Sequence, residues 1–181
     1  MIVTQQQILT GLRYDPCIAY PAERIVEIFN NQNEMPLLEA LQLHLPAQDI
    51  MRATLLYKGI LADCHLHELA CRYAEHNLSK VDCPNPCSIA AIAAKRAWTR
   101  GEIGNRKLQA ARKAAWVATW DVAWGAAPVA AAWMVARDAA WAAAWVVAQR
   151  DVTRWEELLQ ITYSYLAGWL RKKTRENNEV V

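Results

Sequence analysis

The side chains best suited to chemistry fall in one short segment, residues 64–71, which reads CHLHELAC. On a helix, residues three or four positions apart share a face, so Cys64, His67 and Cys71 would point toward one metal ion. Cys83 and Cys87 follow after a turn and would complete a tetrahedral set. These five residues are the candidate metal ligands of the chain.

The same segment also fits a purely structural role. A zinc protease carries HExxH, whereas this segment reads HELAC, and the cysteines form no CxxC pair. In this interpretation Cys64 and Cys71 are small buried residues, and His67 or Glu68 caps or pairs with a neighbouring helix. We favour it, and we therefore expect no cofactor and no stoichiometric zinc.

Other catalytic patterns are missing from the sequence. It shows no strand-to-turn nucleophile elbow, and the segment Gly101-Glu-Ile-Gly104 lacks the Lys-Ser/Thr of a phosphate-binding loop. The carboxylates that would serve acid/base chemistry each have an arginine nearby, which favours ion pairs; they are Asp138, Asp151, Glu156 and Glu157. The sequence thus predicts a protein that is not an enzyme.

Positive charge gathers in residues 95–113, where Glu102 is the only acidic residue. The cations of this basic strip are Lys95, Arg96, Arg100, Arg106, Lys107, Arg112 and Lys113. With Trp98 and Trp116 interleaved, the strip would suit phosphates and a stacked base. Alternatively, the cations simply keep Ala-rich helices soluble. A net charge of only +2 argues against a dedicated nucleic-acid protein.

Helix signals run along most of the chain. The expected helices are 4–12, 21–30, 37–45, 47–57, 62–80, 86–100 and 153–172. Thr4, Asn85 and Asn105 are the expected N-caps, and Gly101 is the expected stop after residue 100. Because period-two alternation and Asn-Gly turns are missing, we expect no strand.

Tryptophan recurs in an alanine-rich stretch between residues 105 and 150. Trp116, Trp120 and Trp124 are spaced by four residues, which predicts one helix face. The Gly125-Ala-Ala-Pro128 segment favours two antiparallel helices, 106–124 and 127–150, over one kinked helix. Whether these tryptophans form a core or an interface stays open.

Together these patterns predict an all-α protein, a bundle of about seven to eight helices with an Ala/Trp-rich antiparallel hairpin. We expect one domain, 1–181, comprising a short-helix lobe (1–60), a helical body (61–150) and a C-terminal helix with a charged tail (151–181). The uncharged run 122–136 is too short to span a membrane, and no secretion signal opens the chain. We therefore expect a cytoplasmic protein.

Three segments carry a resemblance to a known family. They are residues 66–76 (LHELACRYAEH), residues 86–98 (PCSIAAIAAKRAW) and residues 100–103 (RGEI) ahead of the Ala/Trp-rich stretch. On these segments the chain resembles a family of phage and prophage proteins and is similar to Ala-rich helical immunity protein families. The resemblance implies a phage-borne accessory protein and brings no established catalytic residues.

The functional expectation is a binding protein that inhibits or sequesters a host or phage protein. Nine tryptophans exceed what an alanine core needs, and Trp and Arg dominate interface energies. The expected partner-binding residues are Trp98, Arg100, Arg106, Lys107, Arg112, Lys113 and Trp116. The alternatives are a nucleic-acid or nucleotide binder using residues 95–113, and a metal-binding protein using the Cys/His helix. Oligomeric state stays open.

Overall fold

The structure is a computed structural model that describes residues 1–14, 20–80, 82–120 and 154–179. The side chains of residues 12–14 and 116–120 lie outside this description. The fold is predominantly helical, as the sequence predicts, with eight helices and one small sheet among the described residues. Contacts divide the chain into two compact units, one formed by Met1–Leu61 with Trp155–Val181 and the other by Ala62–Arg154.

The first unit begins with an antiparallel sheet of two short strands. β1 (Ile2–Thr4) pairs with β2 (Glu34–Pro36), with Val3 opposite Met35. The expectation of no strand is therefore wrong. Each strand has only three residues and its partner lies about thirty positions away, so no local alternation marks either one.

Helix α1 (Gln5–Tyr14) starts at a reciprocal cap. The Gln7 backbone N–H donates to Thr4 Oγ1 at 3.2 Å, and the Thr4 N–H donates to Gln7 Oε1 at 2.9 Å. This capping box satisfies two backbone donors and confirms the predicted cap at Thr4.

Three further helices precede the middle of the chain: α2 (Ala22–Ile28), α3 (Leu37–Ala40) and α4 (Ala47–Leu56). The predicted helix 37–45 is wrong in length, because α3 ends at Ala40. Pro46 disfavours helical backbone at the residue before it, and Leu41–Leu45 form turns instead.

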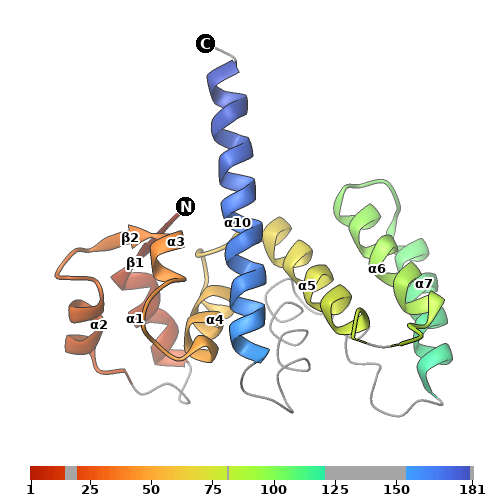
Figure 1. Cartoon of the computed structure of the whole chain (residues 1–181), viewed down its shortest axis with the longest axis horizontal. Helices are drawn as coiled ribbons and strands as arrows, with labels where there is room; N and C mark the ends of the chain where they lie inside the picture. Colours follow the sequence, from red (N-terminus) through yellow and green to blue (C-terminus); the bar gives the residue numbers. More distant parts are fainter. Residues whose placement is uncertain (15–19, 81, 121–153, 180–181) are drawn as a thin grey trace. The chain divides into compact units, whose positions relative to one another are not determined.

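The long helix α10 (Arg154–Glu179) completes the first unit, and Figure 1 shows it beside α4. Its buried residues Trp155, Leu158, Thr162 and Leu166 repeat every three or four positions, so they form one apolar face. The Thr162 hydroxyl lies 3.5 Å from Met51 Sδ of α4. From Arg171 onward the helix is exposed and projects past the other elements of its unit in Figure 1.

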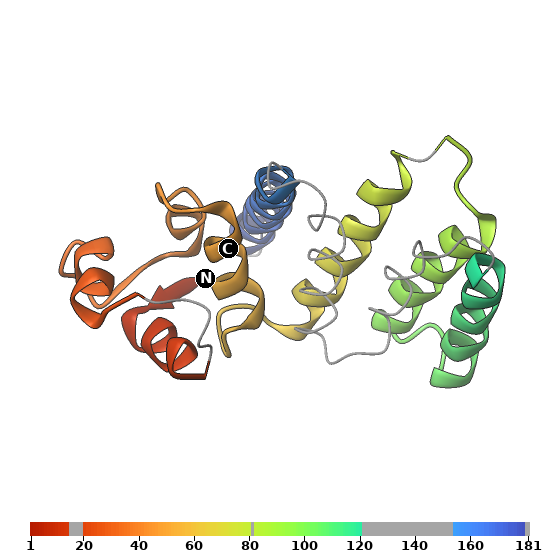
Figure 2. The ribbon, with the colours of Figure 1, turned by 90° about the horizontal axis from the view of Figure 1, so that it is seen from below.

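The second unit contains α5 (Asp63–Leu78), α6 (Pro86–Thr99) and α7 (Asn105–Trp120). Figure 2 shows α6 and α7 side by side, and small residues make this packing close: Ala91 and Ala115 are buried against each other's helices with Cys87 beside them. The predicted hairpin partner, 127–150, lies outside the described residues, as do the side chains of Trp116, Trp120 and Trp124.

The ends of α6 follow the sequence signals. Asn85 Oδ1 accepts from the Cys87 backbone N–H at 2.8 Å, and Pro86 is the first helical residue. At the other end, Gly101 has a φ of +76° and its N–H donates to the Trp98 carbonyl, while the Glu102 N–H donates to Ala97. This is the Schellman arrangement that glycine favours.

Asn105 is not the cap of α7, contrary to the sequence prediction. The Lys107 and Leu108 N–H groups donate to the Gly104 carbonyl, so Asn105 is already helical. The Asn105 side chain instead accepts a hydrogen bond from the Trp98 indole of α6. Among the described residues, none of the helices has the length and apolar character that crossing a membrane requires.

Candidate functional site

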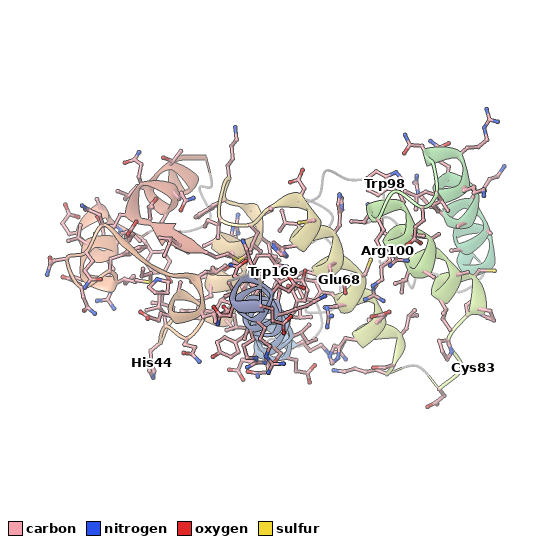
Figure 3. The ribbon with its side chains drawn as sticks, turned by 90° about the horizontal axis from the view of Figure 1, so that it is seen from above. His44, Glu68, Cys83, Trp98, Arg100 and Trp169 are labelled. Carbon is pink, nitrogen blue, oxygen red and sulfur yellow. The ribbon has the colours of Figure 1, made fainter. Side chains whose placement is uncertain are left out.

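The candidate site lies in the second unit, where α5, α6 and the start of α7 carry most of the residues singled out by the sequence (Figure 3). Glu68 and Glu75 are seven positions apart on α5, so they lie on one face two turns apart. That face meets Arg96 of α6.

Arg96 binds both carboxylates at once. Its Nε and Nη2 donate to the two oxygens of Glu68 at 2.9 Å each, and Nη2 also donates to Glu75 Oε2 at 2.8 Å. Arg72 Nε also lies 2.9 Å from Glu68 Oε1. The hydrogen bonds from Glu75 and Glu68 raise the pKa of Arg96. The α5–α6 face therefore neutralises its own charge, and the prediction that Glu68 pairs with a neighbouring helix is confirmed.

A second cluster joins His67, Lys95 and Trp98. The His67 and Trp98 rings meet edge to face, with centroids 5.3 Å apart, and Lys95 Nζ lies 4.3 Å from the Trp98 ring centroid. Burial, with help from the Lys95 charge, lowers the pKa of His67 to about 4, and burial also lowers the pKa of Lys95. At neutral pH the imidazole is therefore uncharged beside a buried amine.

Trp98 is fixed from a third direction. Its indole Nε1 donates to Asn105 Oδ1 at 2.7 Å, which ties the end of α6 to the first residue of α7. A half-buried ring that packs on Lys95 and His67 and donates to Asn105 is positioned by its own unit. Only the exposed part of the Trp98 ring is therefore available for the predicted contact with a partner.

The other predicted partner-binding residues separate into two groups. Arg100 donates through Nε to Glu102 Oε1 at 2.5 Å within the α6–α7 turn, and both side chains are about half exposed. Arg112 is half-buried, and burial lowers its pKa. By contrast, Arg106, Lys107 and Lys113 are exposed. The Trp116 side chain lies outside the described residues.

The candidate metal ligands are not brought together. Cys64 and Cys83 are exposed, Cys87 is half-buried, and Cys71 is buried, which raises the pKa of its thiol to about 11. Cys64 is thus not the small buried residue that the structural interpretation proposed. In the part of the chain that the structure describes, no three His, Cys, Asp or Glu side chains are placed to hold a metal ion.

Sequence reasoning missed two contacts of this site. Lys95 and Trp98 are three positions apart on α6, a spacing that by itself allows the cation–π contact. The Trp98–Asn105 hydrogen bond depends on the direction of the α6–α7 turn, which no local pattern gives.

Comparisons with known proteins bring no further identification: no family model matches the chain, and no curated protein or solved structure is significantly similar to it.

Proposed function

We propose that this chain is a binding protein that docks an acidic surface of a protein partner through the basic face of α7. We define the basic face as Arg106, Lys107 and Lys113, the three exposed cations of the helix. The resemblance to phage and immunity-type proteins adds the biological role that we propose: sequestering or inhibiting that partner.

The observation that carries the proposal is positive charge on α7 that no carboxylate of the described residues pairs with. Every charged residue of α7 is positive, and its first turn contains no acidic residue. Among the described residues, no carboxylate forms an ion pair with Arg106, Lys107 or Lys113. The neighbouring α5–α6 face is the opposite case, because Arg96 is matched there by two glutamates.

Placement at the helix start makes this charge costly. The N-terminus of a helix carries a partial positive charge, so cations in the first turn are disfavoured by about 0.3–1 kcal/mol each. Arg106 and Lys107 occupy that turn. Carboxylates supplied by a partner would remove this repulsion and gain charge-assisted hydrogen bonds, which supports an acidic binding surface.

A nucleic-acid partner is less well supported by the same residues. Such a surface combines many phosphate contacts with aromatic rings free to stack on bases. Here Arg100 is paired with Glu102, and the Trp98 ring is already packed against Lys95 and His67. Three remaining cations fit an acidic protein patch better than a phosphate backbone.

The test is affinity capture with a charge-reversed variant. Tagged wild-type protein is incubated with host lysate in the presence of nuclease, and captured proteins are identified and their apparent affinities measured by titration. We expect Arg106→Glu/Lys107→Glu/Lys113→Glu to weaken capture by at least about tenfold, since each lost pair contributes about 1 kcal/mol or more.

A matched control reverses three charges of the other exposed basic segment. Arg171→Glu/Lys172→Glu/Arg175→Glu alters the exposed end of α10 by the same total charge, and it should capture the partner as wild type does. Equal loss in both triple variants would point to nonspecific electrostatic attraction. Binding of a fluorescent single-stranded oligonucleotide that weakens steeply in a salt series would favour the nucleic-acid alternative.

A further inference from the structure

The first unit contains an apolar pocket of about 70 Å³. Its walls come from both strands and from α1 to α4, and they include Ile25, Phe29, Met35 and Ile50, with the Tyr57 ring beside them. Protein cores seldom leave a void of this size, because side chains pack to near-crystalline density. Two of its wall positions are alanine, Ala40 and Ala53, whose side chains occupy little of this space.

One charged residue lines this pocket among the described residues, Asp49 in the first turn of α4. Tyr20 Oη donates to Asp49 Oδ2 at 2.6 Å. The Thr54 hydroxyl, which is also part of the wall, donates to the Ile50 carbonyl of its own helix at 2.8 Å. The pocket is thus an apolar hollow, partly open to solvent, with one anionic group in the lining that the structure describes.

The Tyr20 hydroxyl keeps its proton over the whole physiological range. Burial, followed by the hydrogen bond to Asp49, raises the pKa of Tyr20 to about 12. A tyrosine that donates to Asp49 leaves the carboxylate as an acceptor for a further donor. The negative charge at this position would repel an anionic ligand and attract a cationic one.

We propose that the pocket binds a small aliphatic molecule with a positively charged head that donates hydrogen bonds, an alkylamine in the simplest case. The alkyl group would fill the space beside Ala53 and Met35, and the ammonium group would pair with Asp49. The volume sets the size: a dry cavity of about 150 Å³ holds benzene, so this pocket takes a smaller, branched alkyl group of about four carbons. This site is separate from the basic face of α7 and does not depend on the function proposed for it.

The experiment uses 2-methylpropylamine as the probe and the full chain labelled with ¹³C at its methionine methyl groups. Met35 lines the pocket, so its methyl signal should shift in a saturable way as the amine is added. Two probes with the same carbon skeleton serve as controls. We expect 2-methylpropanol to bind about tenfold more weakly, because it lacks the charge, and 2-methylpropanoate not to bind.

Three variants test whether the pocket is a binding site or only a gap in the packing. Ala53→Leu fills the pocket, so the Met35 response to the amine should be lost while the melting temperature is unchanged or higher. Ala22→Leu adds the same atoms at an exposed position of α2 and should leave the response intact. Asp49→Asn should weaken the amine by about tenfold and leave the alcohol unchanged.

Three results would overturn the proposal. The first is a Met35 signal that does not move up to the solubility limit of the amine. The second is an equal response of wild type and Ala53→Leu, which would place the amine elsewhere. The third is equal amine affinity of wild type and Asp49→Asn, a comparison that also decides the matter if Ala53→Leu does not fold.

Discussion

Among single residues, Arg96 is a polar link between α5 and α6. Its guanidinium joins Glu68 and Glu75 of α5, and its side chain is only 26% exposed. A partly buried guanidinium with two carboxylate partners contributes more than a surface ion pair, because solvent screens it less and its geometry is fixed by several bonds.

We predict that Arg96→Met lowers the free energy of unfolding by about 2 kcal/mol, between the values for surface and fully buried pairs. Chemical denaturation measures this. The control is Arg100→Met, which removes the exposed pair with Glu102 and should leave the midpoint where it is. If both variants change the free energy of unfolding by the same amount, the contacts of Arg96 with two glutamates contribute no more than an exposed ion pair.

His67 gives the second prediction at this scale, a loss of stability in mild acid. In the unfolded chain its imidazole titrates near 6.5, whereas burial and Lys95 lower the pKa to about 4 in the folded protein. Between these two values the unfolded chain binds the extra proton, so stability is full above pH 6.5 and falls as the pH decreases toward 4.

Replacing His67 should remove part of that pH dependence. We expect His67→Gln to reduce the fall in unfolding free energy between pH 7 and pH 4 by roughly 1 kcal/mol, a value that allows for solvent screening of a half-buried group. Denaturation series at several pH values give the slope. His44→Gln, at an exposed position, should keep the wild-type slope. An unchanged slope in His67→Gln would show that other groups cause the acid sensitivity.

At the scale of elements, Gly11 determines how closely α1 approaches Tyr57. A Cβ atom at Gly11 would overlap the Tyr57 ring. In a helix interior, alanine normally stabilises the folded state by about 1 kcal/mol relative to glycine. A Gly11→Ala variant that is less stable than wild type would therefore indicate that the clash with Tyr57 outweighs the helix propensity. We expect Gly11→Ala to lower the melting temperature, as measured by circular dichroism.

The same substitution in a Tyr57→Leu background tests the cause. Without the ring, Gly11→Ala should become neutral or stabilising, because only the helix preference is left. If Gly11→Ala raises the melting temperature in the wild-type background, α1 does not approach the Tyr57 ring as closely as the structure shows.

The helix ends show which elements the sequence can predict. Thr4, Asn85-Pro86 and Gly101 act on their own neighbours, and each ends or begins a helix where predicted. The two strands cannot be predicted from the sequence, because three residues are too few to show a period-two alternation and the paired residues lie about thirty positions apart. The residue type of Asn105 predicts a cap, but its side-chain oxygen instead accepts a hydrogen bond from the Trp98 indole.

The candidate site was predictable to a similar degree. The helix face that places Glu68 toward a neighbouring helix follows from the spacing of its residues. The identity of its partner does not, because Arg96 lies 28 positions away in the sequence. The apolar pocket could not be foreseen at all, since its walls come from six elements and depend on two alanines that look like ordinary helix formers.

At the scale of the whole molecule, a net charge of +2 conceals a marked separation of charge along the chain. The α5–α6 face cancels its own charge, whereas α7 carries four cations and no acid. We propose that this surplus forms a binding surface for carboxylates of a protein partner.

Zero-length carbodiimide cross-linking of the captured complex tests that claim most directly, because it joins lysine amines only to carboxylates in contact with them. We expect cross-links from Lys107 and Lys113 to aspartate or glutamate residues of the partner. Cross-links confined to Lys58, Lys172 and Lys173, with none from α7, would contradict it.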